Sequence, residues 1–486
     1  MKWDTVIGLE VHAQLKTKSK LFSGAATDFG AKPNTQTCFI DAGLPGVLPV
    51  LNQKAVAMAI QFGLAINARI NSHSYFERKN YFYPDLPKGY QISQFQAPIV
   101  SQGQLAVDRG NGNVTMVEIV RAHLEEDAGK SLHDLQNDVS GIDLNRAGTP
   151  LLEIVTAPCI YSAEEAVQYL KTLHQLVRFL GICDGNMQEG SFRCDVNISL
   201  KPHGSKKLGT RTELKNLNSF RFIEKAILYE QARHQDLLEQ NQPIIQETRL
   251  FCPVTETTQV LRSKENENDY RYFPDPDLLP VVITQEQLEE IKRNMPILPA
   301  EIKNNLQQSS VRLQDEEIQF ILATPANFHY FEQVRNQTDA DEKTIINWLK
   351  GPYAAALNEN NLSFDEPPVP AREMAGLLNH LHNKTISNAI ARQIFDKLWR
   401  QEGRVDDIIA KEGYRQIDDE ILLDSIVQTV VNQYPQQVAE YRGGKEKILA
   451  FFVGQVMKQT KGQANPEQVN QLLKHYLGPG DKPQDS

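Results

Sequence analysis

A length of 486 residues predicts roughly two to four domains, because single hydrophobic cores stop growing at about 250–300 residues. The formal net charge of −10 argues against a protein that coats nucleic acid with a basic surface, although a local basic patch is compatible with it. The five cysteines form no Cys-x-x-Cys pair, and neither an apolar leader nor a run of ~20 apolar residues occurs. We therefore expect a cytoplasmic protein with reduced thiols, no thiolate zinc site and no membrane span.

Apolar and polar residues alternate over residues 6–15, which predicts a strand with one buried face. Its polar face carries Glu10 and His12, which lie about 7 Å apart at a rise of ~3.3 Å per residue. A carboxylate and an imidazole at this spacing can share one cation or one phosphoryl group. The alternative is a solvated sheet face that carries the two residues by chance.

Four further segments, residues 120–127, 150–156, 191–199 and 211–218, also read as strands with charged residues on a polar face. In residues 120–127 this face carries Arg121, His123, Glu125 and Asp127. If antiparallel neighbours align the segments, one concave sheet face collects five candidate ligands: Glu10, His12, Glu125, Glu153 and Asp195. Four carboxylates there would resist ionisation unless a divalent cation neutralised them.

Oxygen ligands with one imidazole suit Mg²⁺ or Mn²⁺ better than a thiolate-binding metal. Arg193, Arg211 and Lys215 lie beside the acids in the sequence and suit a polyphosphate held together with the metal. No G-x-x-x-x-G-K-[ST] loop occurs, so a nucleotide site here would be of a less familiar kind. The alternative is an ordinary sheet surface with salt bridges.

Residues 77–91 show neither a helical nor a strand period, and they contain four aromatic residues, two prolines and three cations. This composition predicts a rigid loop that lines a site, or one that caps the edge of a core. A helix is expected before it, over residues 53–68, after the proline-rich turn at residues 43–49.

Beyond residue 296 helix-forming residues dominate, which predicts amphipathic helices over residues 301–357, a proline-rich connection at 364–370 and two further helices near Met374 and Ile390. Asn465 is a good N-cap for a last helix. We expect an α+β protein with a mixed, largely antiparallel, cradle-like catalytic domain at 1–294. A helical domain at 295–407, a helical tail at 408–478 and a disordered C-terminus at 479–486 would follow.

Between residues 440 and 462 five cations face two acids, a local net charge of +3. An RNA backbone could dock there, although a charged run is more often just a solvated face. The five cations are Arg442, Lys445, Lys447, Lys458 and Lys461.

Residues 142–158, and residues 262–265 followed by 269–278, resemble signatures of the B subunit of the tRNA-dependent amidotransferase, the GatB family. Residues 6–12, 79–91 and 187–197 are similar to it as well, and the similarity runs along nearly the whole chain. The resemblance implies that ATP and Mg²⁺ phosphorylate the side-chain carboxylate of glutamate or aspartate mischarged on tRNA(Gln) or tRNA(Asn). Ammonia from a glutaminase A subunit then displaces the phosphate, in a heterotrimer with a small C subunit.

Carried over by motif, the catalytic and metal-binding residues are Glu10, His12, Glu125, Glu153 and Asp195, with Glu126 as an alternative register for Glu125. The resemblance implies phosphate contacts at Arg193, Lys215 and Asn216. It also implies that an ammonia passage or acceptor-end pocket is lined by Lys79, Tyr81, Tyr83 and Lys88. In the family the basic tail contacts tRNA through phosphates and 2′-hydroxyls.

One departure from the family pattern concerns zinc. Family members often carry a Cys-x-x-Cys where this chain has Cys38 and, three positions later, Asp41, so no zinc is expected there. Two other functions are compatible with the residues: a metal-dependent hydrolase that needs no ATP, and a non-catalytic tRNA-binding scaffold. No Ser–His signature of a self-sufficient glutaminase occurs, so ammonia would come from a partner chain.

Overall fold

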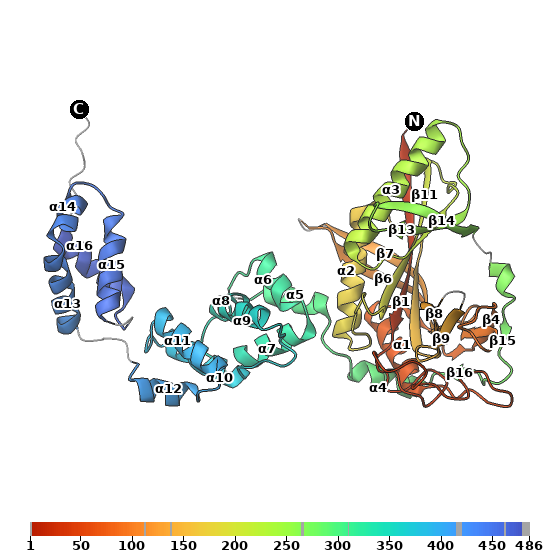
Figure 1. The fold of residues 1–486 in the computed structure, drawn as a ribbon, viewed down its shortest axis with the longest axis horizontal. Coiled ribbons are helices and arrows are strands. Elements are labelled where there is room, and N and C mark those ends of the chain that lie inside the picture. Colours follow the sequence, from red (N-terminus) through yellow and green to blue (C-terminus); the bar gives the residue numbers. More distant parts are fainter. Residues whose placement is uncertain are drawn as a thin grey trace. The chain divides into compact units, whose positions relative to one another are not determined.

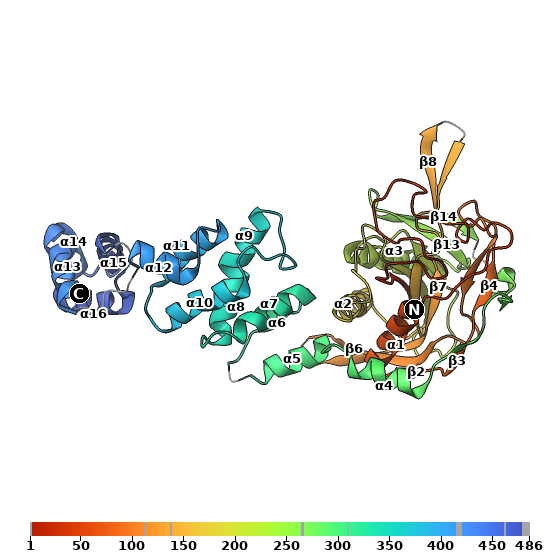
Figure 2. The ribbon, with the colours of Figure 1, turned by 90° about the horizontal axis from the view of Figure 1, so that it is seen from below.

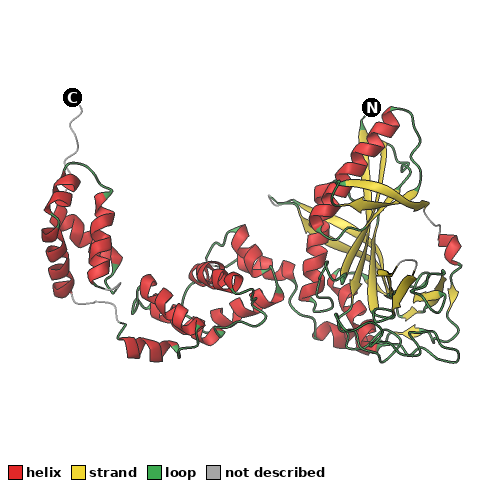
Figure 3. Ribbon diagram, in the orientation of Figure 1, coloured by secondary structure: helices red, strands yellow, loops and turns green. Residues whose placement is uncertain are grey.

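The computed structural model describes residues 2–110, 113–136, 139–263, 267–309, 311–414, 420–460 and 463–478. The chain divides into two compact units, Met1–Ile302 and Lys303–Ser486. Within the described ranges every strand lies in the first unit and the second unit is helical (Figure 3). This confirms the α+β class. The finer division at residue 408 stays a prediction, and the segment 479–486 lies outside the described residues.

The first unit is built on a nine-stranded sheet with the order β14-β13-β12-β11-β1-β10-β7-β6-β2 (Figure 1). Among the described strands of this sheet only β12 and β13 pair in parallel, so the expected mixed, largely antiparallel sheet is confirmed. The strands are β1 (Trp3–Gln14), β2 (Arg69–Ile70), β6 (Val100–Asp108), β7 (Val114–Glu126), β10 (Pro150–Thr156), β11 (Phe192–Pro202), β12 (Thr212–Lys215), β13 (Glu247–Cys252) and β14 (Thr257–Ser263).

The alternation in β1 explains its two faces. Ile7, Leu9, Val11 and Ala13 are fully buried in the core of the first unit, whereas the residues between them are partly exposed. Three helices contribute to this core: α1 (Gln53–Ala65), α2 (Ala163–Phe179) and α3 (Phe220–Glu239). Each is capped at its N-terminus by a side chain, from Asn52, Ser162 and Ser219 respectively.

A small three-stranded sheet, β15-β4-β5, accompanies the large one. In Figure 1, α2 and α3 lie on one side of the large sheet, and β4 and β15 lie on the other. The strands of the small sheet are β4 (Glu77–Asn80), β5 (Tyr90–Ser93) and β15 (Phe273–Pro274). The expectation of an irregular loop over 77–91 was therefore wrong at both ends. Residues 77–80 form a strand because they pair with β15, which is far away in the sequence, and because Arg78 binds Asp275 at 3.0 Å.

The remaining elements of the first unit are short. Figure 2 shows the hairpin of β8 (Lys130–Gln136) and β9 (Val139–Asp143) projecting from the body of this unit. β3 (His73–Ser74) pairs with β16 (Val281–Val282). The short helix η1 (Glu267–Tyr270) precedes β15, and α4 (Gln285–Arg293) contributes Leu288 and Ile291 to the core beside α1.

The second unit consists of helices whose apolar stripes match the sequence pattern. Its elements are α5 (Pro299–Gln307, which begins in the first unit), α6 (Asp315–Ile321), α7 (Pro325–Arg335), α8 (Glu342–Trp348), η2 (Leu349–Tyr353), α9 (Ala354–Glu359), α10 (Ala371–His382), α11 (Asn388–Trp399), α12 (Val405–Glu412), α13 (Glu420–Gln433), α14 (Pro435–Arg442), α15 (Ile448–Gln459) and α16 (Pro466–Leu477).

The predicted helices near Met374 and Ile390 are confirmed as α10 and α11, and both residues are buried. Asn465 caps α16 by accepting a hydrogen bond from the Glu467 N–H at 2.9 Å. Helices α13, α15 and α16 share a core that includes Val427 and Phe452. No helix in the described ranges combines the length and the apolar character that a membrane span requires.

Candidate active site

The polar face of the central strands carries most of the predicted site residues. In β1, His12 lies opposite Glu153 of β10 on one side and Arg193 of β11 on the other. Glu153 in turn lies opposite His123 of β7. Four strands that are far apart in sequence thus present their charged side chains in one row, because side chains on one face of a sheet repeat every second residue.

His12, Glu125 and Glu153 form a compact cluster in which one donor atom of each lies within 4.8 Å of the others. The Nε2 atom of His12 is 3.4 Å from a carboxylate oxygen of Glu153 and 3.9 Å from one of Glu125. His123 contacts the same two carboxylates at 3.3 and 3.9 Å. His123 lies on the polar face predicted for residues 120–127 but is not among the predicted ligands, although its i, i+2 spacing to Glu125 is a usable signal.

The structure separates Glu125 from its neighbour Glu126. Glu125 accepts a hydrogen bond from the Ser93 hydroxyl at 2.9 Å and lies 3.5 Å from the Lys79 ammonium. Glu126 is turned away, accepts the Ile92 N–H at 2.8 Å and pairs with Lys88. Lys88 is therefore engaged outside the cluster, whereas Lys79 adjoins it.

Glu10 and Asp195 lie opposite each other, two residues further along β1 and β11 from the cluster. Glu10 accepts a hydrogen bond from the Asn197 side chain at 2.8 Å, and Asp195 pairs with Lys215. The five expected ligands therefore fall into a three-residue cluster and a neighbouring pair. Lys215 also lies 3.6 Å from Glu213.

Arg193 is held by Asp127, a carboxylate that is not among the predicted ligands. Its Nη2 atom donates to Asp127 at 2.9 Å, and Gln14 donates to the same oxygen of Asp127 at 2.9 Å. The Nε atom of Arg193 is buried without a hydrogen-bond partner among the described atoms. This geometry fixes a guanidinium beside the cluster and leaves one of its donors available.

Other predicted site residues have partners elsewhere. The Asn216 side chain donates to the Phe251 carbonyl at 3.1 Å, and its backbone is left-handed with φ of 64°, which describes a turn residue. The Tyr81 hydroxyl donates to Gln91 at 2.8 Å, and the Tyr81 and Tyr83 rings meet edge to face with centroids 5.7 Å apart.

The basic tail residues are only partly engaged. Arg442 donates to the Leu477 carbonyl at 3.0 Å, and Lys445 pairs with Glu440 at 3.0 Å. Lys447 is the N-cap residue of α15 and Lys458 lies in its last turn, while Lys461 lies outside the described residues.

Asp41 stands where family members often carry the second cysteine of a Cys-x-x-Cys pair, and it is buried. Its carboxylate accepts from the Lys20 ammonium at 3.1 Å, the Ser23 hydroxyl at 2.9 Å and the Cys38 N–H at 2.9 Å. Asp41 therefore stabilises the turn at residues 38–41 through an ion pair with Lys20. All five cysteines of the chain are free thiols.

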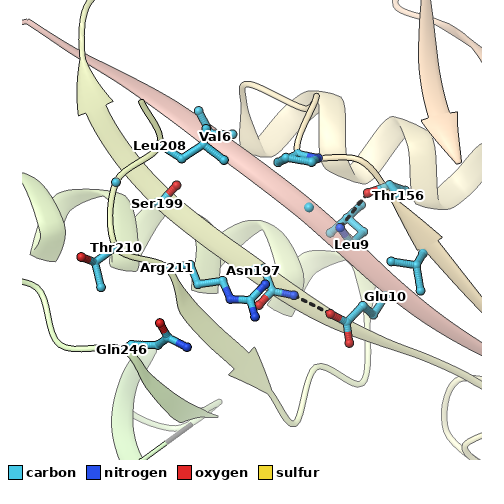
Figure 4. Close-up of a pocket in the computed structure, with 14 residues that line it drawn as sticks. Val6, Leu9, Glu10, Thr156, Asn197, Ser199, Leu208, Thr210, Arg211 and Gln246 are labelled. Carbon is cyan, nitrogen blue, oxygen red and sulfur yellow. Dashed lines mark hydrogen bonds between the residues drawn. The ribbon is translucent and has the colours of Figure 1, made fainter. Parts of the chain in front are cut away.

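A pocket of about 450 Å³ opens beside Glu10 (Figure 4). Gly8, Asn197, Arg211 and Gln246 are among its lining residues. Figure 4 shows the Arg211 guanidinium among the side chains that line this pocket, with Asn197 bonded to Glu10. Arg211 was predicted to suit a polyphosphate, but no local sequence pattern marks Gly8 or Gln246 as its neighbours.

Charges around the cluster compensate one another. Burial alone would lower the pKa of His12, but the hydrogen bond to Glu153 and its charge outweigh burial and raise it. Burial would raise the pKa of Glu153, yet the charge of His123 and hydrogen bonds from both histidines hold it well below its usual value. Burial would likewise raise the pKa of Glu125, but the charge of Lys79 outweighs it and lowers the pKa. Both carboxylates are thus ionised at neutral pH. A cation bound by His12 would need this imidazole in its neutral form, because a ligating imidazole is neutral.

The donor set fits a hard divalent cation. Two carboxylates and one imidazole converge within the reach of a single ion, and thiolates are absent from this group. The fold and this cluster define a class: an α+β protein whose largely antiparallel sheet gathers an imidazole and two carboxylates on its polar face.

Residues 5–289 match the family described as the GatB/GatE catalytic domain, and residues 329–477 match the GatB domain. The chain is 67% identical to the B subunit of the aspartyl/glutamyl-tRNA(Asn/Gln) amidotransferase of Legionella pneumophila strain Paris, over 98% of this chain and 100% of that protein. It is 54% identical to the protein of that name from Coxiella burnetii strain Dugway 5J108-111, over the same shares. The chain belongs to the GatB family, which confirms the resemblance.

Proposed function

We propose that this chain is the B subunit of a tRNA-dependent amidotransferase and activates the side-chain carboxylate of glutamyl-tRNA(Gln), aspartyl-tRNA(Asn) or both. It would work with ATP and Mg²⁺ in the cytoplasm, in a heterotrimer with a glutaminase A subunit and a small C subunit. The observation that carries the proposal is the cluster of His12, Glu125 and Glu153 in a chain that matches amidotransferase B subunits along their whole length.

The chemistry requires an activation step, because a carboxylate has no good leaving group. One carboxylate oxygen of the substrate attacks the γ-phosphorus of ATP, the bond to the β-phosphate oxygen breaks, and an acyl phosphate and ADP form. Ammonia then attacks the carbonyl carbon, the acyl phosphate bond breaks, and phosphate leaves with the amide as product. A bound Mg²⁺ would neutralise charge that develops on the phosphoryl oxygens.

Three neighbouring groups of residues would bind the metal, the phosphates and the nucleoside of ATP. His12, Glu125 and Glu153 would hold the metal, with His123 in contact with both carboxylates. Arg193 and Lys215, fixed by Asp127 and Asp195, would bind phosphates. The base and ribose of ATP would occupy the pocket lined by Gly8, Asn197, Arg211 and Gln246.

The other predicted groups also enter the proposal. Lys79 lies against Glu125, so Lys79 and Tyr81 would line the ammonia passage near the acceptor end. The basic tail would contact the tRNA backbone through Arg442, Lys445, Lys447, Lys458 and Lys461.

The two alternatives make different demands. A metal-dependent hydrolase would act without ATP, and a scaffold would not need the cluster at all. The full-length similarity to amidotransferase subunits favours neither.

The decisive experiment uses the chain assembled with its A and C subunits, glutamyl-tRNA(Gln) and ammonium chloride as nitrogen donor. We expect ATP cleavage and amide formation that require both the charged tRNA and Mg²⁺, and that decline in Glu10→Ala. Hydrolysis without ATP would support the hydrolase. Full activity in variants of the cluster would support the scaffold.

Filling the pocket beside Glu10 tests the nucleotide placement. A Cβ atom at Gly8 would have its nearest neighbour at 3.8 Å, so Gly8→Val fits the fold while its side chain takes up pocket volume. We expect KM for ATP to rise at least about tenfold, since lost contacts worth ~1.4 kcal/mol change affinity by that factor. Gly24→Val, at a glycine with no atom within 4 Å of such a Cβ, is the matched control. An unchanged KM in Gly8→Val would place the nucleotide elsewhere.

A further inference from the structure

Arg121 lies on the polar face of β7, two residues before His123. Its side chain is partly buried, and its Nε atom is buried without a hydrogen-bond partner. Within the described part of the chain the Arg121 guanidinium has no acid at ion-pair distance, whereas Lys79 and Arg193 each lie within 3.5 Å of a carboxylate oxygen. Partial burial of an unpaired charge is unfavourable, so an anionic ligand that supplies the missing partner would be stabilised there.

The strand register places Arg121 in one row with Glu10. Glu10 lies opposite Val155 of β10, and Val155 lies opposite Arg121 of β7. At ~4.8 Å between neighbouring strands, the Cα atoms of Glu10 and Arg121 are about 10 Å apart. Val155 also lines the pocket beside Glu10, and His123 contacts the carboxylate cluster. Arg121 is therefore next to the cluster along its own strand and one strand away from the pocket.

A stacked pair of aromatic rings lies beside the Arg121 guanidinium. The Cζ atom of Arg121 is 5.8 Å from the centroid of the Phe95 ring. Phe95 stacks on Tyr272 with centroids 4.5 Å apart and an interplanar angle of 10°, and its N–H donates to Glu77 at 2.8 Å. A guanidinium held against an anchored ring loses less freedom when it binds a planar anion.

The position of Arg121 relative to the other cations indicates which anion it takes. Arg193 and Lys215, the proposed phosphate contacts, belong to β11 and β12, on the far side of β1 from β7. In-line phosphoryl transfer places the attacking and the leaving oxygen on opposite sides of the phosphorus. With the phosphates held at β11 and β12, the attacking carboxylate approaches from the side of β7. A guanidinium matches a carboxylate through two parallel hydrogen bonds.

We infer that Arg121 binds the side-chain carboxylate of the aminoacyl-tRNA and thereby distinguishes the substrate from its amide product. The inference rests on the proposed function, in which that carboxylate attacks ATP. The carboxylate accepts two hydrogen bonds from the guanidinium, whereas the amide is neutral and has a single acceptor oxygen. The amidated tRNA is therefore held less tightly than the substrate, which favours release of the product.

The test measures equilibrium binding of two forms of one tRNA to the assembled heterotrimer, with Mg²⁺ present and ATP omitted. The two forms are glutamyl-tRNA(Gln) and glutaminyl-tRNA(Gln), which differ only in the side-chain carboxylate. We expect wild type to bind the glutamyl form about tenfold more tightly, because hydrogen bonds to a charged group reach this range. In Arg121→Met the glutamyl form should weaken to the level of the glutaminyl form.

Binding of the glutaminyl form reports on the fold of the variant, and it should stay as in wild type, because Met keeps the apolar stem of the side chain. Arg121→Lys keeps the charge without the paired donors, so it should retain part of the discrimination. Arg109→Met, at an exposed arginine directly after β6, is the matched control and should bind both forms as wild type does.

Kinetics with ammonium chloride as nitrogen donor provide a second readout. In Arg121→Met we expect a lower kcat for ATP cleavage at saturating glutamyl-tRNA(Gln), with KM for ATP unchanged. A raised KM for ATP with the discrimination kept would assign the guanidinium to the nucleotide phosphates and overturn the inference.

Three binding results would also contradict the role of Arg121. These are a wild type that binds both forms equally, discrimination that survives in Arg121→Met, and equal weakening of both forms in that variant. If wild type amidates neither glutamyl-tRNA(Gln) nor aspartyl-tRNA(Asn), the proposed function fails first, and this result is distinct from the others.

Discussion

Glu153→Gln should reduce tRNA-dependent ATP cleavage by about 10³-fold, because a metal ion's electrostatic contribution to such a reaction is worth several kcal/mol. Glu153 is the residue that both His12 and His123 contact most closely, at 3.4 and 3.3 Å. The substitution keeps the volume of the side chain and removes its charge. We expect Mn²⁺ binding, followed by electron paramagnetic resonance on the full chain, to weaken together with the activity.

Glu118→Gln is the matched control, since Glu118 is an exposed carboxylate on β7, the strand that carries Glu125. It should leave ATP cleavage and Mn²⁺ binding at wild-type levels. If Glu153→Gln binds Mn²⁺ as wild type does, the cluster does not hold the metal, whatever happens to the activity.

Glu230→Ala should destabilise the first unit by about 3–5 kcal/mol, the usual cost of removing one partner from a buried ion-pair network. Glu230 is fully buried on α3 and binds Arg233 through Nη2 at 2.7 Å and Arg249 through Nε at 3.1 Å. His234 of this network shares a hydrogen bond of 2.9 Å with Thr212 at the start of β12, the strand that carries Lys215. Hydrogen exchange of α3 and β13 amides in the full chain measures the loss.

The same carboxylate predicts a dependence on pH. Burial alone would raise the pKa of Glu230, but hydrogen bonds from His234, Arg233 and Thr258 outweigh burial and lower it from 4.5 to about 2. A lowered pKa in the folded state stabilises the fold above pH 4.5, and the stabilisation is lost as pH falls from there towards about 2. The shift corresponds to ~3 kcal/mol.

Protection in wild type should therefore fall more steeply over this pH range than in Glu230→Gln, which cannot titrate at this position. Glu224→Gln, an exposed carboxylate on the same helix, should behave as wild type. Equal pH profiles for wild type and Glu230→Gln would show that the network does not depend on this charge.

Alternation, and in residues 150–156 a short apolar run with one carboxylate, predicted the strands that build the site. The alternation of residues 6–15 predicted which side chains of β1 are buried, and residues 150–156 match β10 at both ends. This works because the two faces of a strand alternate strictly, so a buried face leaves a local pattern. The same reasoning placed His12, Glu125 and Glu153 on polar faces that the structure then brings together.

Periodicity could not choose between two adjacent acids. Glu125 and Glu126 point to opposite sides of β7, and either register was compatible with the sequence. Glu126 binds the Ile92 N–H and Lys88, and both of these belong to the hairpin of β4 and β5. Glu126 therefore lies outside the cluster. That hairpin itself escaped prediction, because its partner β15 lies nearly two hundred residues further along the chain.

Motifs and alternation are local properties, and they were enough to predict the family, the α+β class and the strands that carry the candidate site residues. The strand order, which joins His12 and Glu153 but leaves Glu10 and Asp195 as a separate pair, becomes visible only in three dimensions. The same holds for Asn216, which is a turn residue, and for Arg193, which is hydrogen-bonded to Asp127. Such choices depend on contacts between residues far apart in sequence, whose geometry no local pattern records.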